Sequence, residues 1–224
     1  MLSEEDSRHA LRSLRLRPGD QVSLADGNGT VAEGRLMEEA NGQAAVEVGG
    51  VYRVVRRRPV VSIALAPPKG DRLAWAVQKL AELGVDATIL IRTEHSVRAW
   101  GEDRAGRAVA RLEAVAREAA MQSRRPFLME VRPPVPLEEA LNSGGAPLVA
   151  LWEGASEPLS ACLPLEAGGI RLVVGPEGGF SEREVETMRR AGTALASLGS
   201  SILRTETAAI VGAALVLARY GRLG

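Results

Sequence analysis

The segment LGSSILRTETAAIVGAALVL, residues 198–217, indicates the fold class most clearly. Its second half has the apolar pattern of a buried helix, and its first half places four polar residues, Arg204 to Thr207, directly before that helix. The preceding run ALASLG predicts a short strand, and the helix is expected to begin with a cap at Thr205. A strand, a loop and a buried helix in this order are typical of an α/β sheet.

The segment RLVVGPEGGFSEREVETMRRAG, residues 171–192, repeats this layout. A buried strand leads into a glycine-rich loop, Ser181 and Glu184 form a capping box, and Gly192 ends the helix. Ligands of α/β sheets bind at loops that follow the carboxyl ends of strands. We therefore expect the backbone of residues 175–178 and 198–203 to surround a pocket. The apolar side chains expected to line it are those of Leu198, Ile202 and Leu203. Such a lining would suit an adenine-bearing cofactor better than a simple anion.

Dinucleotide-binding and P-loop folds are disfavoured, because neither G-x-G-x-x-G nor G-x-x-x-x-G-K-[ST] occurs in the chain. From residue 59 onward, apolar strands alternate with helical patterns, which predicts a parallel sheet with crossover helices. The expected strands are VVSIALAPP, ATILI, PLVALW and the two described above, and the expected helices cover 71–83 and 104–122. RPPVPLEEA is interpreted as a loop that enters a short helix.

The first 58 residues follow a different pattern. Ser3 and Asp6 predict a helix start, and Ala10, Leu11 and Leu14 form a helical stripe. The period then falls to two, with a hairpin about residues 26–29 and two further strands separated by Asn41-Gly42 and Gly49-Gly50. Short strands with tight turns predict a small β-barrel, so we expect domains at 1–58 and 59–224.

Composition sets limits on location and on the kind of site. The 224 residues are 46% hydrophobic and 25% charged, no apolar run is long enough to span a membrane, and the acidic start lacks a signal-peptide pattern. A single cysteine, Cys162, excludes an intramolecular disulfide and a multi-cysteine zinc site, so a cytoplasmic location is expected. The 28 basic residues balance 28 acidic ones, but almost all the basic ones are arginine, whose guanidinium pairs with phosphate.

The segment EAAMQSRRP, near the end of the long expected helix, is a third candidate site. Glu118 and Gln122 are four residues apart and share a helix face, and Arg124 and Arg125 follow. Arginines at a helix end also interact favourably with the helix dipole, so an ordinary surface terminus is the alternative interpretation.

The three segments together closely resemble the RsmE family, bacterial methyltransferases that make N3-methyluridine in 16S ribosomal RNA. HALRSLRLRPGDQVSLADGNGT, KGDRLAWAVQKLAELGV and TEHSV extend the resemblance through most of the chain. It implies a PUA-like β-barrel followed by a SPOUT domain, a parallel sheet with a C-terminal trefoil knot. It also implies S-adenosyl-L-methionine as cofactor, no metal, the small ribosomal subunit as partner, and a homodimer with active sites at the subunit interface.

The resemblance also implies roles for individual residues. Arg204 or Arg125 would stabilise charge that develops on the uracil oxygens, and Glu118 or Glu206 would accept the N3 proton. Glu206 could alternatively orient Arg204 through an ion pair, and Gln122 belongs to the same candidate catalytic group. The expected cofactor-binding residues are Leu151, Gly175, Pro176, Glu177, Gly178, Leu198, Gly199, Ile202, Leu203 and Thr207.

Two other functions are compatible with parts of the pattern. A SPOUT enzyme that methylates the ribose 2′-hydroxyl would carry a serine-leucine-asparagine run where this chain has LRTETA. A non-catalytic RNA-binding protein would be expected to lose the GPEGG and ILRTETA segments, which are intact here.

Members of the family usually begin with a basic, aromatic strand of the type RRFFV, whereas this chain starts at MLSEEDSRHA. Either the start is shortened or RNA is bound by other segments.

Overall fold

The computed structural model describes residues 1–40, 43–96, 102–142 and 144–223. The chain divides into two compact units, Met1–Arg56 and Arg57–Gly224. Within the described residues, no helix is long and apolar enough to cross a membrane.

The first unit contains a three-stranded antiparallel sheet in the order β1-β2-β3. Its elements are α1 (Glu4–Arg8), a π-helical turn (His9–Ser13), β1 (Gln21–Ala25), β2 (Thr30–Ala40) and β3 (Gln43–Arg53). The predicted hairpin is confirmed, since the Asp26 carboxylate accepts from the N–H groups of Asn28 and Thr30 at 2.7 and 2.9 Å. Closure of this sheet into a barrel stays a prediction.

Two details of this unit differ from the sequence interpretation. The expected break at Gly49-Gly50 is wrong, because β3 runs through both glycines and a register shift opposite Glu33 and Gly34 absorbs the extra residue as a bulge. Leu14 leaves the predicted apolar stripe and is 57% exposed, whereas Ala10 is buried. The predicted turn at Asn41-Gly42 lies outside the described residues.

The second unit is built on a six-stranded parallel sheet in the order β6-β5-β4-β8-β7-β9. Its strands are β4 (Val60–Leu65), β5 (Ala87–Arg92), β6 (Glu130–Pro136), β7 (Leu148–Leu151), β8 (Gly169–Val174) and β9 (Ala194–Ala196). Its helices are α2 (Arg72–Leu83), α3 (Glu102–Gln122), α4 (Leu137–Ala140), α5 (Leu159–Cys162), α6 (Glu182–Arg190) and α7 (Thr205–Arg219). The α/β parallel sheet predicted from the sequence is therefore confirmed, and its knot stays a prediction.

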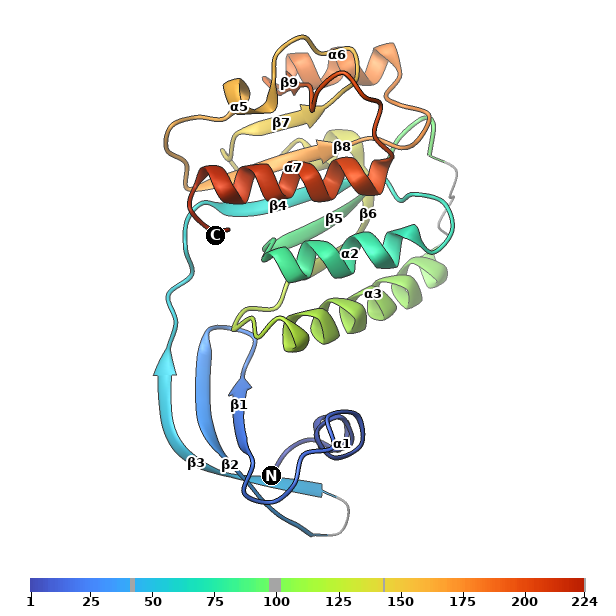
Figure 1. Ribbon diagram of the computed structural model, residues 1–224. Helices are drawn as coiled ribbons and strands as arrows, with labels where there is room; N and C mark the ends of the chain where they lie inside the picture. The colour runs from blue at the N-terminus through green and yellow to red at the C-terminus, as the bar shows by residue number, and fades with distance from the viewer. Residues whose placement is uncertain (41–42, 97–101, 143, 224) are drawn as a thin grey trace. The chain divides into compact units, whose positions relative to one another are not determined.

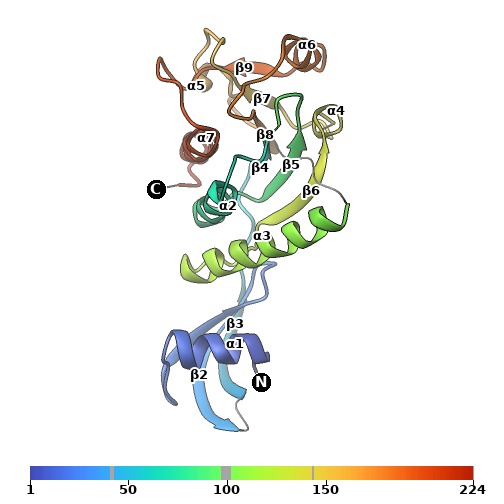
Figure 2. The same ribbon diagram turned by 90° about the vertical axis from the view of Figure 1, so that its right-hand side faces the viewer.

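Helices cover both faces of this sheet. Successive residues of a strand point to opposite faces, so alternate side chains contact different helices. In β4, Val61, Ile63 and Leu65 pack with α2, α3 and α7, whose ribbons lie side by side in Figure 1. Ala64 points the other way and packs with α4 and α6, which Figure 2 shows on the opposite side from α2. The strands are apolar on both faces because a doubly covered parallel sheet has no solvent-facing side.

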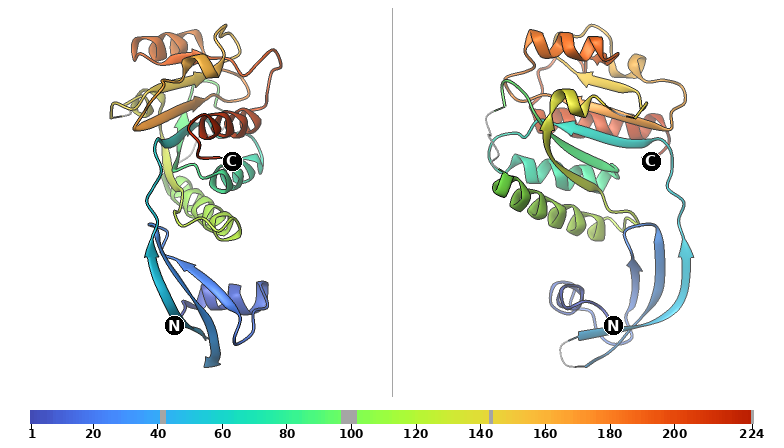
Figure 3. Two further views of the ribbon diagram at one scale, coloured as in Figure 1. Left: turned by 60° about the vertical axis from the view of Figure 1, so that its left-hand side comes forward. Right: turned by 180° about the vertical axis from the view of Figure 1, so that it is seen from behind.

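The segment RPPVP is an edge strand rather than the expected loop. Residues 130–136 form β6, which pairs with β5 across a register shift between Ile89 and Ile91. Proline lacks a backbone N–H and is tolerated in a sheet only at edges and irregularities, and β6 is the outermost strand. The view from behind in Figure 3 shows this strand with α4 directly after it.

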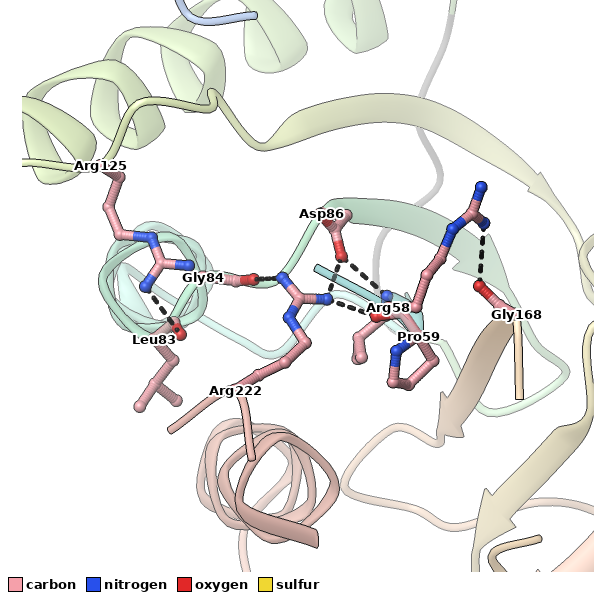
Figure 4. A network of polar contacts seen from close by, with 9 residues as sticks. Arg58, Pro59, Leu83, Gly84, Asp86, Arg125, Gly168 and Arg222 are labelled. Atoms are coloured by element: carbon pink, nitrogen blue, oxygen red, sulfur yellow. Dashed lines mark hydrogen bonds and ion pairs between the residues drawn. The ribbon is translucent and has the colours of Figure 1, made fainter. Parts of the chain in front are cut away.

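A buried ionic network connects the C-terminal segment to the amino ends of the strands (Figure 4). Arg222 donates to the Asp86 carboxylate at 2.6 Å and to the carbonyl oxygens of Pro59 and Gly84 at 2.5 and 2.7 Å. Both side chains of the Arg222–Asp86 ion pair are 6% exposed, and Asp86 also accepts from the Val61 N–H at 2.8 Å. The network joins the end of α7 to the starts of β4 and β5.

Candidate active site

The strands β7, β8 and β9 are parallel, so their carboxyl ends meet at one edge of the sheet. The loops that leave these ends enclose a pocket. Residues 151–153, 174–176, 179–180 and 197–203 line it, with Thr205 and Ala208 from α7. Both apolar and hydroxyl-bearing side chains line its wall, a composition typical of a small-molecule site.

The glycine loop, residues 175–179, is fixed by contacts on several sides. The Thr205 hydroxyl donates to the Gly175 carbonyl at 3.0 Å, so Thr205 links α7 to the loop. A Cβ atom on Gly175 would lie 3.0 Å from the Phe180 ring, so a side chain there would crowd the ring. The predicted capping box of Ser181 and Glu184 is confirmed and begins α6 directly after the loop. The helix cap expected at Thr205 is wrong, because Arg204 is the N-cap residue.

The last loop, residues 197–204, is held by the segment after β7. The Ser197 N–H donates to the Glu157 carbonyl at 2.7 Å, and the Leu159 N–H donates to the Ser197 carbonyl at 3.0 Å. Gly199 has φ +121°, a conformation that side chains rarely adopt. α7 then approaches β7 so closely that a Cβ atom on Gly212 would lie 2.7 Å from Leu151 Cδ1.

Most residues expected to bind the cofactor lie on this pocket. Those that line it are Leu151, Gly175, Pro176, Leu198, Gly199, Ile202 and Leu203. Glu177, Gly178 and Thr207 are not among the lining residues. Ser200 and Ser201 belong to the loop 198–203, whose backbone was expected to surround the pocket. The sequence did not single out Trp152, Glu153, Phe180 and Ser197, which also line it. Their position in or next to the predicted strand ends was the available signal.

The Glu177 carboxylate faces the start of α2 instead. Its Oε1 accepts from the Lys69 N–H at 3.0 Å and lies 3.7 Å from an Arg72 guanidinium nitrogen. Partial burial raises the pKa of Glu177, but the hydrogen bond from Lys69 and the charges of Lys69 and Arg72 outweigh it, so this pKa lies below its usual value. Negative charge on Glu177 therefore holds the glycine loop against α2.

Arg204 and Glu206 flank Thr205 but differ in environment. Arg204 is exposed and makes no side-chain cap to α7. Glu206 is 5% exposed, and the ion pair recorded for it joins its Oε1 to Arg72 Nε at 3.6 Å rather than to Arg204. Its Oε2 atom is buried and has no hydrogen-bond partner among the described residues. A buried carboxylate oxygen with free lone pairs can accept a proton or a hydrogen bond.

The third candidate group lies elsewhere in the chain. Glu118 and Gln122 are exposed on α3. Arg125 donates to the Leu83 carbonyl at 3.3 Å, before the start of β5, and burial and the Arg222 guanidinium lower its pKa (Figure 4). The amino ends of parallel strands lie opposite the carboxyl ends, so one chain does not bring these residues to the pocket.

Comparison with known protein families also divides the chain into two parts, close to the two compact units of the structure. Residues 56–217 match a family described as an RNA methyltransferase domain. Residues 2–48 match an RNA methyltransferase PUA domain. The first match covers the whole pocket, and the second covers most of the antiparallel sheet.

Individual relatives match over nearly the full chain. Ribosomal RNA small subunit methyltransferase E of Mycobacterium bovis is 34% identical over 218 residues, which cover 92% of this chain and 81% of that protein. The Bacillus subtilis protein of the same name is 31% identical over 92% of this chain and 85% of its own. The crystal structure of the Neisseria gonorrhoeae protein of that name, bound to S-adenosyl methionine, superposes with a TM-score of 0.88 at 29% identity, covering 98% of this chain and 91% of that one. The chain therefore belongs to the ribosomal RNA small subunit methyltransferase E family.

Proposed function

We propose that this chain transfers a methyl group from S-adenosyl-L-methionine to N3 of a uridine in 16S ribosomal RNA. The observation that carries the proposal is the pocket at the ends of β7, β8 and β9, together with a relative of closely similar fold that binds this cofactor. Apolar Leu151, Leu198 and Leu203 suit an adenine ring, and the Glu153 carboxylate and neighbouring serines suit its polar groups. When bound, the cofactor supplies a methyl group already activated by its positively charged sulfur.

The residues next to the pocket suit the remaining chemistry. Uridine N3 carries a proton that must leave, and loss of this proton places negative charge on the uracil oxygens. The guanidinium of Arg204 would stabilise that charge, and the free Oε2 of Glu206 would accept the proton. The alternative catalytic residues lie near the amino ends of the strands, opposite the pocket; they are Arg125, Glu118 and Gln122. A second copy of the chain would have to bring them to the pocket.

Methyl transfer to unmodified small ribosomal subunits tests the function. The protein and a labelled donor would be incubated with subunits that lack the modification, and the RNA digested for mass analysis of its nucleosides. We expect N3-methyluridine in 16S RNA. A 2′-O-methylated nucleoside would instead support the ribose methylase, and binding without transfer would support the non-catalytic alternative.

We also propose a homodimer, because α7 is apolar on both sides although the described part of the chain covers only one of them. Ala209, Ala213 and Val216 are fully buried, whereas Val211 and Leu215 on the same helix are 36% and 49% exposed. A helix that is apolar all round is normally buried. A partner chain on this face would remove the exposed side chains from water.

Replacement of Leu215 by glutamate is expected to weaken the dimer, because it would place a charge in the proposed interface. Light scattering should give twice the mass of one chain for the wild type and a lower mass for Leu215→Glu. Leu165→Glu is the matched control, since Leu165 is 83% exposed and lies outside α7. A monomeric wild type, or an intact Leu215→Glu dimer, would contradict this proposal.

The first unit is proposed to bind RNA through its exposed arginines. Arg12, Arg15 and Arg17 lie close together in the sequence and are all exposed. Each arginine–phosphate contact releases counterions, so affinity for 16S RNA should fall as salt rises. The double variant Arg12→Ala/Arg15→Ala is expected to lower the slope of log K against log salt by up to about two units. A salt-independent affinity, or an unchanged slope, would count against this role.

A cytoplasmic location follows from the proposed substrate, because bacterial small ribosomal subunits are found there. The Cys162 thiol is partly buried, and burial and the nearby Glu157 carboxylate raise its pKa. A raised pKa leaves less of the thiolate, which is the reactive form of cysteine.

A further inference from the structure

The turn that follows β5 contacts the glycine loop through a histidine. His95 Nδ1 lies 3.1 Å from the Gly178 carbonyl oxygen and 3.1 Å from the Gly179 carbonyl oxygen. Both partners are acceptors, so Nδ1 must carry the hydrogen and donates to both. One side chain therefore satisfies two successive carbonyls of the loop.

This contact determines the shape of the loop. Two successive carbonyls face one donor only where the backbone turns between them, and Gly179 has φ +71°. A Cβ atom on Gly178 would lie 3.1 Å from His95 Cβ, and one on Gly179 would lie 2.8 Å from Glu153 Oε1. The loop is thus packed between His95 and Glu153, and Glu153 lines the pocket.

The turn that carries His95 is held by hydrogen bonds of its own. The Thr93 and Ser96 hydroxyl oxygens are 2.7 Å apart, and the Ser96 N–H donates to the Thr93 carbonyl at 3.0 Å. The Glu94 N–H donates to Glu184 Oε1 at 2.9 Å, and the other oxygen of this buried carboxylate accepts from the Ser181 N–H. The capping box of α6 therefore also holds the turn that carries His95.

We propose that His95 is a positioning residue for the methyl donor, acting through the carbonyls of Gly178 and Gly179. The proposal rests on the proposed function, because it assumes that the donor binds in this pocket. Without the histidine, the two carbonyls would need other partners and a glycine-rich segment would gain conformations that binding must remove. A preorganised loop binds its ligand more tightly.

Two substitutions of His95 separate positioning from other roles. His95→Ala removes the donor, whereas His95→Asn places an amide N–H near the position of Nδ1. Calorimetry with S-adenosyl-L-methionine should show Kd raised about tenfold for His95→Ala and within about threefold of wild type for His95→Asn. His9→Ala, which removes the chain's other histidine, should leave Kd unchanged. Thermal unfolding should verify that every variant is folded at the temperature of the titration.

Each outcome has a distinct meaning. Wild type that binds no donor would remove the proposed function itself. Wild type that binds, with His95→Ala binding equally well, would overturn the positioning role alone. Equal loss of affinity in His95→Asn and His95→Ala would also overturn it, because the restored donor would have no effect. An unchanged Kd in His95→Ala together with a lowered kcat would mean that His95 acts on the substrate rather than on the loop.

Discussion

Replacement of Asp86 by alanine is expected to lower the free energy of unfolding by about 3–5 kcal/mol, which is typical when one partner of a buried ion pair is removed. Asp86 and Arg222 are both 6% exposed in their side chains, so the remaining guanidinium would stay buried without its counter-charge. The change would also leave the Val61 N–H without its acceptor at the start of β4. Chemical denaturation followed by circular dichroism would measure the loss.

Two further variants test the cause of this effect. Glu130→Ala breaks the exposed pair of Glu130 and Arg132, and is expected to cost less than about 1 kcal/mol because solvent screens that pair. Asp86→Ala/Arg222→Met removes both charges of the buried pair and should recover part of the stability. Similar small losses for Asp86→Ala and Glu130→Ala would show that the network in Figure 4 does not stabilise the fold.

Replacement of Arg204 by alanine is expected to lower kcat by about 100- to 1000-fold, the range found when a group that stabilises transition-state charge is removed. The residues on both sides of Arg204 line the pocket, so its guanidinium is available to a base that enters there. Stability should hardly change, because the side chain is exposed and does not cap α7. Single-turnover methylation of small subunits at saturating donor would give the rate.

Two control variants distinguish the loss of the Arg204 charge from damage to the folded structure. Arg204→Lys keeps the charge but not the planar fork of donors, so an intermediate rate is expected. Arg219→Ala removes an exposed arginine at the other end of the same helix and should leave kcat unchanged. An unchanged kcat in Arg204→Ala would exclude Arg204 from the mechanism.

The sequence predicted the parts of the fold that follow local rules. The apolar strands, the helix end at Gly192 and the capping box at Ser181 each depend on residues close together in the chain. The strand β6 was missed because its prolines normally break a sheet, and only its edge position makes them acceptable. The continuous β3 was missed because a bulge that accommodates two glycines depends on the partner strand.

Part of the candidate site could also be predicted from the sequence, and part could not. The glycine loop and the last loop were predicted because strand-end loops in one sheet must lie near each other. The side chains that contact the glycine loop were not predicted, since Arg72, His95 and Thr205 come from separate elements. Periodicity carries no signal for such long-range contacts, and it gave no indication that Asp86 would pair with Arg222.

The loops after β7, β8 and β9 are proposed to enclose the methyl donor. A crystal structure of the protein grown with saturating S-adenosyl-L-methionine would locate the donor. We expect density for it in contact with residues 151–153, the glycine loop and residues 197–203. Density for the donor at any other place in the chain, with this pocket empty, would contradict the proposal.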